Sequence, residues 1–151
     1  MVKFQKSYED GELHVNKLCE YLKEKNVGVQ FATLDQQLKG IDLIINNEKY
    51  EIKKQLDPEC VIIEETGTCG KKGWFYTSEA TYIVEICHDG TGMIIELSKL
   101  KQAMETLKNT YGIHLNEPTD GWYGDKWQSS YRRIPSDLIE EYAEGKRFRW
   151  K

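Results

Sequence analysis

The segment 41–55, IDLIINNEKYEIKKQ, constrains the fold of this chain more than any other part of the sequence. Ile41, Leu43 and Ile45 alternate with their neighbours, as in a strand that buries one face. The asparagine pair 46–47 follows, and asparagine tolerates the positive φ angles of a tight two-residue turn. The chain then returns as EKYEIKKQ. We therefore predict a β-hairpin that turns at this asparagine pair.

The predicted register places two carboxylates and an ammonium group on one face of the hairpin. Asp42 lies opposite Glu51, and Lys53 follows two residues later on the same face. Two neighbouring carboxylates repel each other unless one binds a proton or a cation joins them. A Mg²⁺ ion resolves this conflict, because it prefers oxygen ligands, lowers the pKa of a bound water and neutralises charge on phosphate oxygens. The pattern suits phosphodiester hydrolysis, with Lys53 orienting the nucleophile or contacting the phosphate.

A solvated polar face with a cross-strand ion pair is the alternative interpretation of the same three residues. Asp42 lies among aliphatic residues, and Glu51 lies between Tyr50 and Ile52. Charged residues inside strands of this apolar character usually have a specific role, because burying a charge is costly.

The rest of the chain predicts an α/β protein with one mixed sheet and helices packed on it. We expect helices at 8–25, 98–111 (with Ser98 as N-cap) and 135–143, a helical turn within 74–80, a polar loop at 35–40, and strands at 27–33, 60–65, 81–87, 93–97 and 129–134. The length of 151 residues corresponds to a single domain over 1–151, with residues 113–151 as a C-terminal extension packed on it.

Charge and hydropathy exclude several classes of protein. A net charge of −4 argues against a polycation that coats nucleic acid, but not against an enzyme with an acidic metal site and local basic grips. No apolar run approaches the roughly 20 residues that cross a bilayer. The first residues, MVKFQKSYEDGELH, contain no apolar signal core, so we expect a cytoplasmic protein with no membrane partner.

Two motifs resemble a known nuclease family. GID at 40–42, then EIK at 51–53 after a gap of eight residues, resembles the signature of the PD-(D/E)XK nucleases, the restriction-endonuclease-like superfamily, with Ile41 in place of the usual proline. Gln55 extends the match to E-x-K-x-Q. The stretch GWFYTSEATY at 73–82 is similar to a G-W-(aromatic or aliphatic)-Y-x-S-x-A-x-Y stretch of small phage and bacterial members.

The resemblance covers roughly residues 8 to 100 and implies a mixed β-sheet flanked by helices with an α-β-β-β-α-β core. It implies Mg²⁺-dependent cleavage of DNA, with Mn²⁺ as a substitute. Asp42, Glu51 and the carbonyl of Ile52 would ligate the metal. Lys53 would be the catalytic lysine, and Gln55 a supporting polar group.

The family often adds an acid from the first helix. Glu12 is our candidate, with Glu9 and Glu20 as rivals. An exposed helix charge without a catalytic role is the alternative for Glu12.

Eight further residues are candidates for contact with DNA: Trp74, Tyr76, Ser78, Arg132, Arg133, Lys146, Arg147 and Arg149. The aromatic members could stack on unpaired bases, and packing in the core is the alternative. The basic C-terminal members alternate with aromatic residues and could grip phosphates. A solubilising tail whose aromatic side chains dock on the body is the alternative.

We therefore expect a Mg²⁺-dependent deoxyribonuclease, preferably an endonuclease or an enzyme of junctions and flaps. A non-catalytic DNA-binding or protein-interaction domain with the same fold is the alternative, with the aromatic loop 122–127 as its interaction surface. Metal-dependent cleavage of RNA is a third option, because fold analogy does not settle the substrate. A homodimer stays open, since small nucleases of this fold often cut two strands as dimers.

Overall fold

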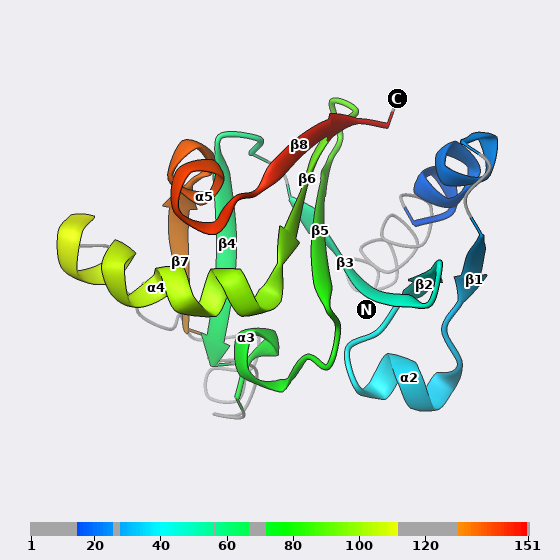
Figure 1. Cartoon of the computed structure of the whole chain (residues 1–151), viewed down its shortest axis with the longest axis horizontal. Helices are drawn as coiled ribbons and strands as arrows, with labels where there is room; N and C mark the ends of the chain where they lie inside the picture. The colour runs from blue at the N-terminus through cyan, green and yellow to red at the C-terminus, as the bar shows by residue number, and fades with distance from the viewer. Residues whose placement is uncertain (1–14, 26–27, 56, 67–71, 112–129, 151) are drawn as a thin grey trace, which may run out of the picture.

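A six-stranded mixed sheet forms the centre of the molecule (Figure 1). The computed structural model describes residues 15–25, 28–55, 57–66, 72–111 and 130–150. In spatial order the strands are β1 (Val29–Phe31), β2 (Leu43–Ile45), β3 (Glu48–Gln55), β5 (Tyr82–Cys87), β6 (Thr91–Glu96) and β8 (Lys146–Arg149). Neighbouring strands are antiparallel except β3 and β5, which are parallel. The expected α/β class is confirmed, with a sheet that is mostly antiparallel.

The expectation of a single sheet is wrong. Strands β4 (Cys60–Thr66) and β7 (Ser130–Pro135) pair with each other in a separate two-stranded sheet. β4 therefore leaves the main sheet after β3, and the parallel neighbour of β3 is β5 instead. Of the expected extension 113–151, the described residues supply β7 to this second sheet and β8 to the edge of the first.

Helices cover both faces of the main sheet (Figure 1). They comprise residues 15–24, α2 (Leu34–Leu38), α3 (Trp74–Thr77), α4 (Leu97–Tyr111) and α5 (Ser136–Ala143). The helix of residues 15–24 packs through Leu18 against Val84 and Ile86, whereas Ile83 faces the opposite side, with α4, α5 and β4. β5 is thus buried on both faces. None of the helices in the described ranges is long and apolar enough to cross a membrane.

The predicted hairpin is confirmed, including its turn. Asn46 and Asn47 have φ angles of 50° and 67°, the left-handed values of a type I′ turn. Leu43 pairs with Tyr50, as the register requires. The regular ladder ends at this pair, so Asp42, the residue that precedes Leu43, is not part of it.

The polar loop expected at 35–40 is wrong, because this segment contains helix α2. Thr33 and Gln36 form a capping box: the Thr33 amide donates to the Gln36 side chain at 2.8 Å, and the Gln36 amide donates to the Thr33 hydroxyl at 3.3 Å. This reciprocal cap satisfies two backbone donors and allows a five-residue helix in a polar sequence.

The N-cap expected at Ser98 is also wrong. Helix α4 begins one residue earlier, at Leu97, and the Ser98 hydroxyl donates to the Glu96 carboxylate at 3.0 Å. Leu97 is buried, so the first turn is held by packing on the core.

The basic C-terminal segment forms a strand that the sequence analysis did not expect. β8 pairs with β6, and the amide of Trp150 donates to the carbonyl of Gly90 at 2.8 Å. Trp150 is buried and Phe148 packs beside it, in the cluster that contains Leu18. The aromatic residues of this segment thus dock on the body of the protein.

The positive φ at Asn47 predicts that substitutions there differ in their effect on stability. Asn47→Val places a β-branched residue at φ 67° and should lower the free energy of unfolding by about 1–2 kcal/mol, whereas Asn47→Gly should lower it little or not at all. Urea denaturation measures both, with the exposed Lys49→Val as control. Equal losses in Asn47→Val and Asn47→Gly would contradict the turn geometry.

Candidate active site

Strand β3 carries a row of polar side chains on one face, because alternate residues of a strand point the same way. Glu51, Lys53 and Gln55 form this row, and Glu51 and Gln55 are buried. The Lys53 ammonium lies 2.9 Å from Glu51 Oε1 and 5.6 Å from the centre of the Trp74 ring. The carboxylate and the ammonium that the sequence analysis placed together are thus in direct contact.

Asp42 approaches this row from the edge of β3. Its amide donates to the Tyr50 carbonyl at 2.8 Å, and its Oδ2 accepts from the Ile52 amide at 2.7 Å. The carboxylate therefore lies against the backbone of β3, instead of directly opposite Glu51 as expected. The N–H and C=O of an extended residue point to the same edge of its strand, so the Ile52 carbonyl faces the edge where Asp42 lies.

Asp42 and Glu51 differ in their environments. Burial raises the pKa of Asp42, although the hydrogen bond from Ile52 and the charge of Lys53 act in the opposite direction. Glu51 is 6% exposed, and its Oε2 is buried without a hydrogen-bond partner in the described structure. A buried carboxylate oxygen without a partner is costly, which marks a place for a ligand.

A glycine and a serine lie beside this oxygen of Glu51. Gly40 has a φ of 78°, and a Cβ there would lie 3.2 Å from Glu51 Oε2 and 3.0 Å from Ser78 Oγ. The Ser78 hydroxyl donates to the Gly40 carbonyl at 3.3 Å. Gly40 thus allows the backbone to approach the carboxylate closely.

Glu85 is a further acid of this region that the sequence analysis missed. It pairs with Lys53 across the parallel strands β3 and β5 and is 4% exposed. Burial raises its pKa to about 8, with Lys53 lowering it and Glu51 raising it. Its Oε1 also has no hydrogen-bond partner in the described part of the chain. Its environment therefore favours the protonated carboxyl group.

One signal in the sequence could have found Glu85. The alternation of β5 assigns Tyr82, Val84 and Ile86 to one face, which leaves Glu85 on the other face with Ile83. An acid on a strand with two buried faces is an anomaly. Its pairing with Lys53 is a long-range contact, which local periodicity does not specify.

The donor atoms at this site fit the Mg²⁺ ion expected from the sequence only in part. Asp42, the unpartnered oxygen of Glu51 and the Ile52 carbonyl are oxygen donors of the type that Mg²⁺ prefers. No group of three or more His, Cys, Asp or Glu side chains in the described ranges is arranged to hold a metal ion. The expected set contains two such side chains and a backbone carbonyl, and Mg²⁺ usually retains several waters. Glu12 lies outside the described residues.

The aromatic and serine candidates for DNA contact lie on or beside α3. Trp74 is buried beneath the Lys53 ammonium, and Ser78 is buried beside Gly40. Tyr76 is 48% exposed, and its ring packs edge-on against Phe75. Tyr76 is therefore the member of this group that is open to an external ligand.

The basic candidates lie on β7 and β8. Arg132 forms an ion pair with Glu65, and Arg133 forms one with Asp57. Arg147 is held by two carboxylates of α5. Lys146 and Arg149 are exposed on the edge strand β8.

Comparisons of this chain with protein-family models, with curated proteins and with solved structures found no match. The functional interpretation therefore depends on the residues and on their geometry.

The raised pKa of Glu85 predicts a specific pH dependence of stability. Its pKa is raised from 4.5 in the unfolded chain to about 8 in the folded protein. Its contribution is therefore complete below pH 4.5 and is lost as the pH rises towards 8 and beyond. Between these values the free energy of unfolding should fall by up to about 1.4 kcal/mol per pH unit through this group.

Glu85→Gln should remove this pH dependence, because an amide does not titrate. Urea denaturation of both proteins between pH 5 and about 8, in the presence of chelator, measures the difference. Glu48→Gln, at an exposed position of β3, is the matched control and should keep the wild-type slope. Parallel pH profiles for wild type and Glu85→Gln would show that Glu85 is ionised in the folded protein.

Proposed function

We propose that this chain is a metal-dependent nuclease of the PD-(D/E)XK type, with a restriction-endonuclease-like fold, that hydrolyses phosphodiester bonds of DNA. The observation that carries the proposal is the buried Glu51 carboxylate. One of its oxygens contacts the Lys53 ammonium at 2.9 Å, and the other has no partner in the described structure. The free carboxylate oxygen suits a metal cation as its partner, and the adjacent ammonium suits a phosphate oxygen.

The order of elements supports this proposal. A helix at 15–24 precedes β1, β2 and β3, and α3 and then β5 follow. Apart from the short helix α2 between β1 and β2 and the strand β4 after β3, this is the α-β-β-β-α-β order that the motif resemblance implies. The inserted strand β4 belongs to the second sheet and leaves the pairing of β3 with β5 intact. The EIK motif lies in β3, beside this parallel pairing.

Each proposed metal donor is held in place by the chain itself. The Ile52 amide fixes Asp42 at the edge of β3, and Lys53 fixes one oxygen of Glu51. The second Glu51 oxygen, the Asp42 carboxylate and the Ile52 carbonyl would hold Mg²⁺, or Mn²⁺ in its place. The bound metal would supply Lewis-acid stabilisation of charge on the phosphate and a water of lowered pKa.

Lys53 is the group proposed to act on the reacting atoms. Its side chain is 32% exposed, so it is open to solvent and to an approaching phosphate. Contact with Glu51 and the Trp74 ring restricts the ammonium to one place. In that place it donates hydrogen bonds that orient the attacking water towards phosphorus. Gln55 would support the row from the far end of β3.

Loss of the Lys53 charge should abolish cleavage without unfolding the protein. Lys53→Met keeps an apolar side chain against Trp74 and should lower the rate of Mg²⁺-dependent DNA cleavage by at least about 100-fold, because a positioned donor to the reacting atoms is removed. Assays on linear, circular, flap and four-way-junction DNA, with Mg²⁺, Mn²⁺ or chelator, measure the effect.

Lys49→Met removes the same charge from an exposed position of the same strand and should retain cleavage. Circular dichroism and thermal unfolding verify that both variants are folded. Wild-type cleavage by a folded Lys53→Met protein would refute the role of Lys53.

Metal binding is measurable without any substrate. Mn²⁺ at 100 times its dissociation constant should stabilise the wild-type fold by about 2.7 kcal/mol, because it binds the folded state. Glu51→Gln and Asp42→Asn should each reduce this stabilisation, since each removes a charged oxygen donor. Thermal unfolding with and without Mn²⁺ measures it, and Glu48→Gln serves as control. Equal stabilisation of the wild type and all three variants by Mn²⁺ would show that the metal binds at another site.

A second function, as a protein-interaction domain, is favoured by one surface feature. Phe31, Leu34 and Leu38 are exposed large apolar residues on β1 and α2, at the end of the sheet opposite β8. Exposed large apolar residues that form a patch often mark a contact with another protein. Binding that needs no divalent ion, together with intact DNA in every assay above, would favour this function over the nuclease.

A further inference from the structure

A pocket lies on the face of the main sheet that carries the polar row of β3. Its volume is about 330 Å³, within the range of small-ligand sites. Gln55, the last residue of the row, is part of its lining. Glu85 and Met93 also line it, and they point to one face because they pair directly across β5 and β6. Residues 58–61 form the opposite wall.

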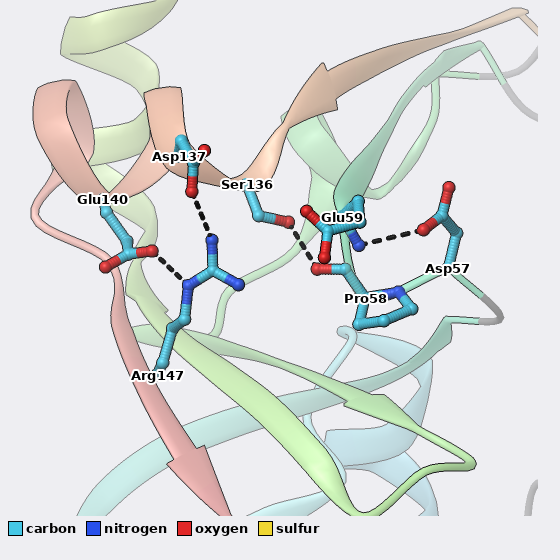
Figure 2. Close-up of polar contacts among 7 residues, drawn as sticks. All are labelled: Asp57, Pro58, Glu59, Ser136, Asp137, Glu140 and Arg147. Atoms are coloured by element: carbon cyan, nitrogen blue, oxygen red, sulfur yellow. Dashed lines mark hydrogen bonds and ion pairs between the residues drawn. The ribbon is translucent and has the colours of Figure 1, made fainter.

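The wall formed by residues 58–61 is fixed to the start of α5 (Figure 2). The Ser136 hydroxyl donates to the Pro58 carbonyl at 2.9 Å, and the Ser136 amide donates to the Glu59 carbonyl at 2.8 Å. The Glu59 amide donates to the Asp57 carboxylate at 2.9 Å. Ser136 is itself buried, so the wall is a fixed part of the fold.

The floor of the pocket contains a carboxyl group that lacks a partner. Glu85 is 4% exposed, and its Oε1 has no hydrogen-bond partner in the described structure. The charged groups that act on Glu85 are Lys53 and Glu51 of β3. The Lys53 ammonium contacts Glu51 at 2.9 Å, so one ammonium is shared between two buried acids. A cation from outside the chain would give Glu85 a counter-charge of its own.

The mouth of the pocket has an excess of acids. Two arginines and four acids line it or bind its arginines: Arg147, Arg149, Glu59, Asp89, Asp137 and Glu140. Arg147 is bound by Asp137 and Glu140, both on α5 (Figure 2). The charge of Arg149 acts on Asp89. This balance of charge favours a cation over an anion as the ligand.

An organic cation suits the pocket better than a metal ion. No group of three or more His, Cys, Asp or Glu side chains in the described ranges is arranged to hold a metal. An ammonium group, by contrast, is a compact point charge with three donors and can bind a single carboxylate. Pro58, Val61 and Met93 line the pocket with apolar surface that suits an alkyl chain. A cationic group at each end of the chain would match Glu85 and the acidic mouth.

We propose that this pocket binds a linear aliphatic diamine, with one ammonium group at Glu85 and the other at Glu59 of the mouth. The inner ammonium donates hydrogen bonds to the Glu85 carboxylate, and the alkyl chain packs against Met93 and Val61. The site uses none of the proposed metal donors, so the inference does not depend on the nuclease function.

The test measures binding of 1,4-diaminobutane to the full chain by isothermal titration calorimetry, in the presence of chelator. At about pH 8 alkyl amines keep their protons. Butylamine is the probe with the same chain and one ammonium group, and 1,4-butanediol is the probe without charge. The diamine should bind at least about tenfold more tightly than butylamine, and the diol should not bind.

The role of Glu85 is tested by a change of charge that keeps the shape of the side chain. Glu85→Gln should weaken binding of the diamine at least about tenfold, because it removes the carboxylate that accepts from the ammonium. Glu48→Gln removes the same charge from an exposed position of β3 and should bind as the wild type does. Equal affinity of the wild type and Glu85→Gln would overturn the proposal.

The location of the ligand is tested by filling the pocket. Cys60→Phe adds a large side chain at a partly exposed position of the lining and should abolish binding, whereas Cys60→Ser leaves the pocket open and should bind as the wild type does. The Cys60 carbonyl, which accepts from Gln55 at 3.1 Å, is kept in both variants. Circular dichroism verifies that each variant is folded.

Three results with folded proteins would overturn the proposal. The first is no binding of the diamine to the wild type. The second is equal binding to Cys60→Phe and Cys60→Ser, which would show that the diamine binds at another surface. The third is binding of butylamine or the diol as tightly as the diamine, which would show that the two charges are not recognised.

Discussion

The parallel pairing of β3 with β5 is the constraint on which the rest of the site depends. It places Glu85 beside Lys53, and the alternation within β3 places Glu51 on the same face. Two buried acids therefore share the neighbourhood of a lysine ammonium that contacts one of them. The burial of Glu85 next to Glu51 raises the pKa of Glu85 to about 8, because ionising a second carboxylate there is costly.

Burial of these two acids costs stability. One oxygen of Glu51 and one of Glu85 have no hydrogen-bond partner in the described structure. Each such atom lowers the free energy of unfolding, and an apolar residue of similar size would pack better. Violations of this kind are typical of sites that bind a ligand, where the missing partner comes from outside the chain.

Strand β3 is held along both edges. At its start it pairs with β2 through the asparagine turn, and along its length it pairs with β5. The polar row therefore has little freedom to move, and Lys53 and Gln55 keep a constant separation.

The sequence by itself determined the hairpin, its asparagine turn and the contact of Glu51 with Lys53, because turn chemistry and strand alternation act between near neighbours. It also determined most helices and strands, although the cap that forms α2 was overlooked. Tertiary structure alone decided that Glu85 joins Lys53, that Asp42 turns onto the backbone of β3, and that β4 leaves the main sheet for β7. These features arise from pairing between distant segments, and the local pattern of a strand does not specify which strand will be its neighbour.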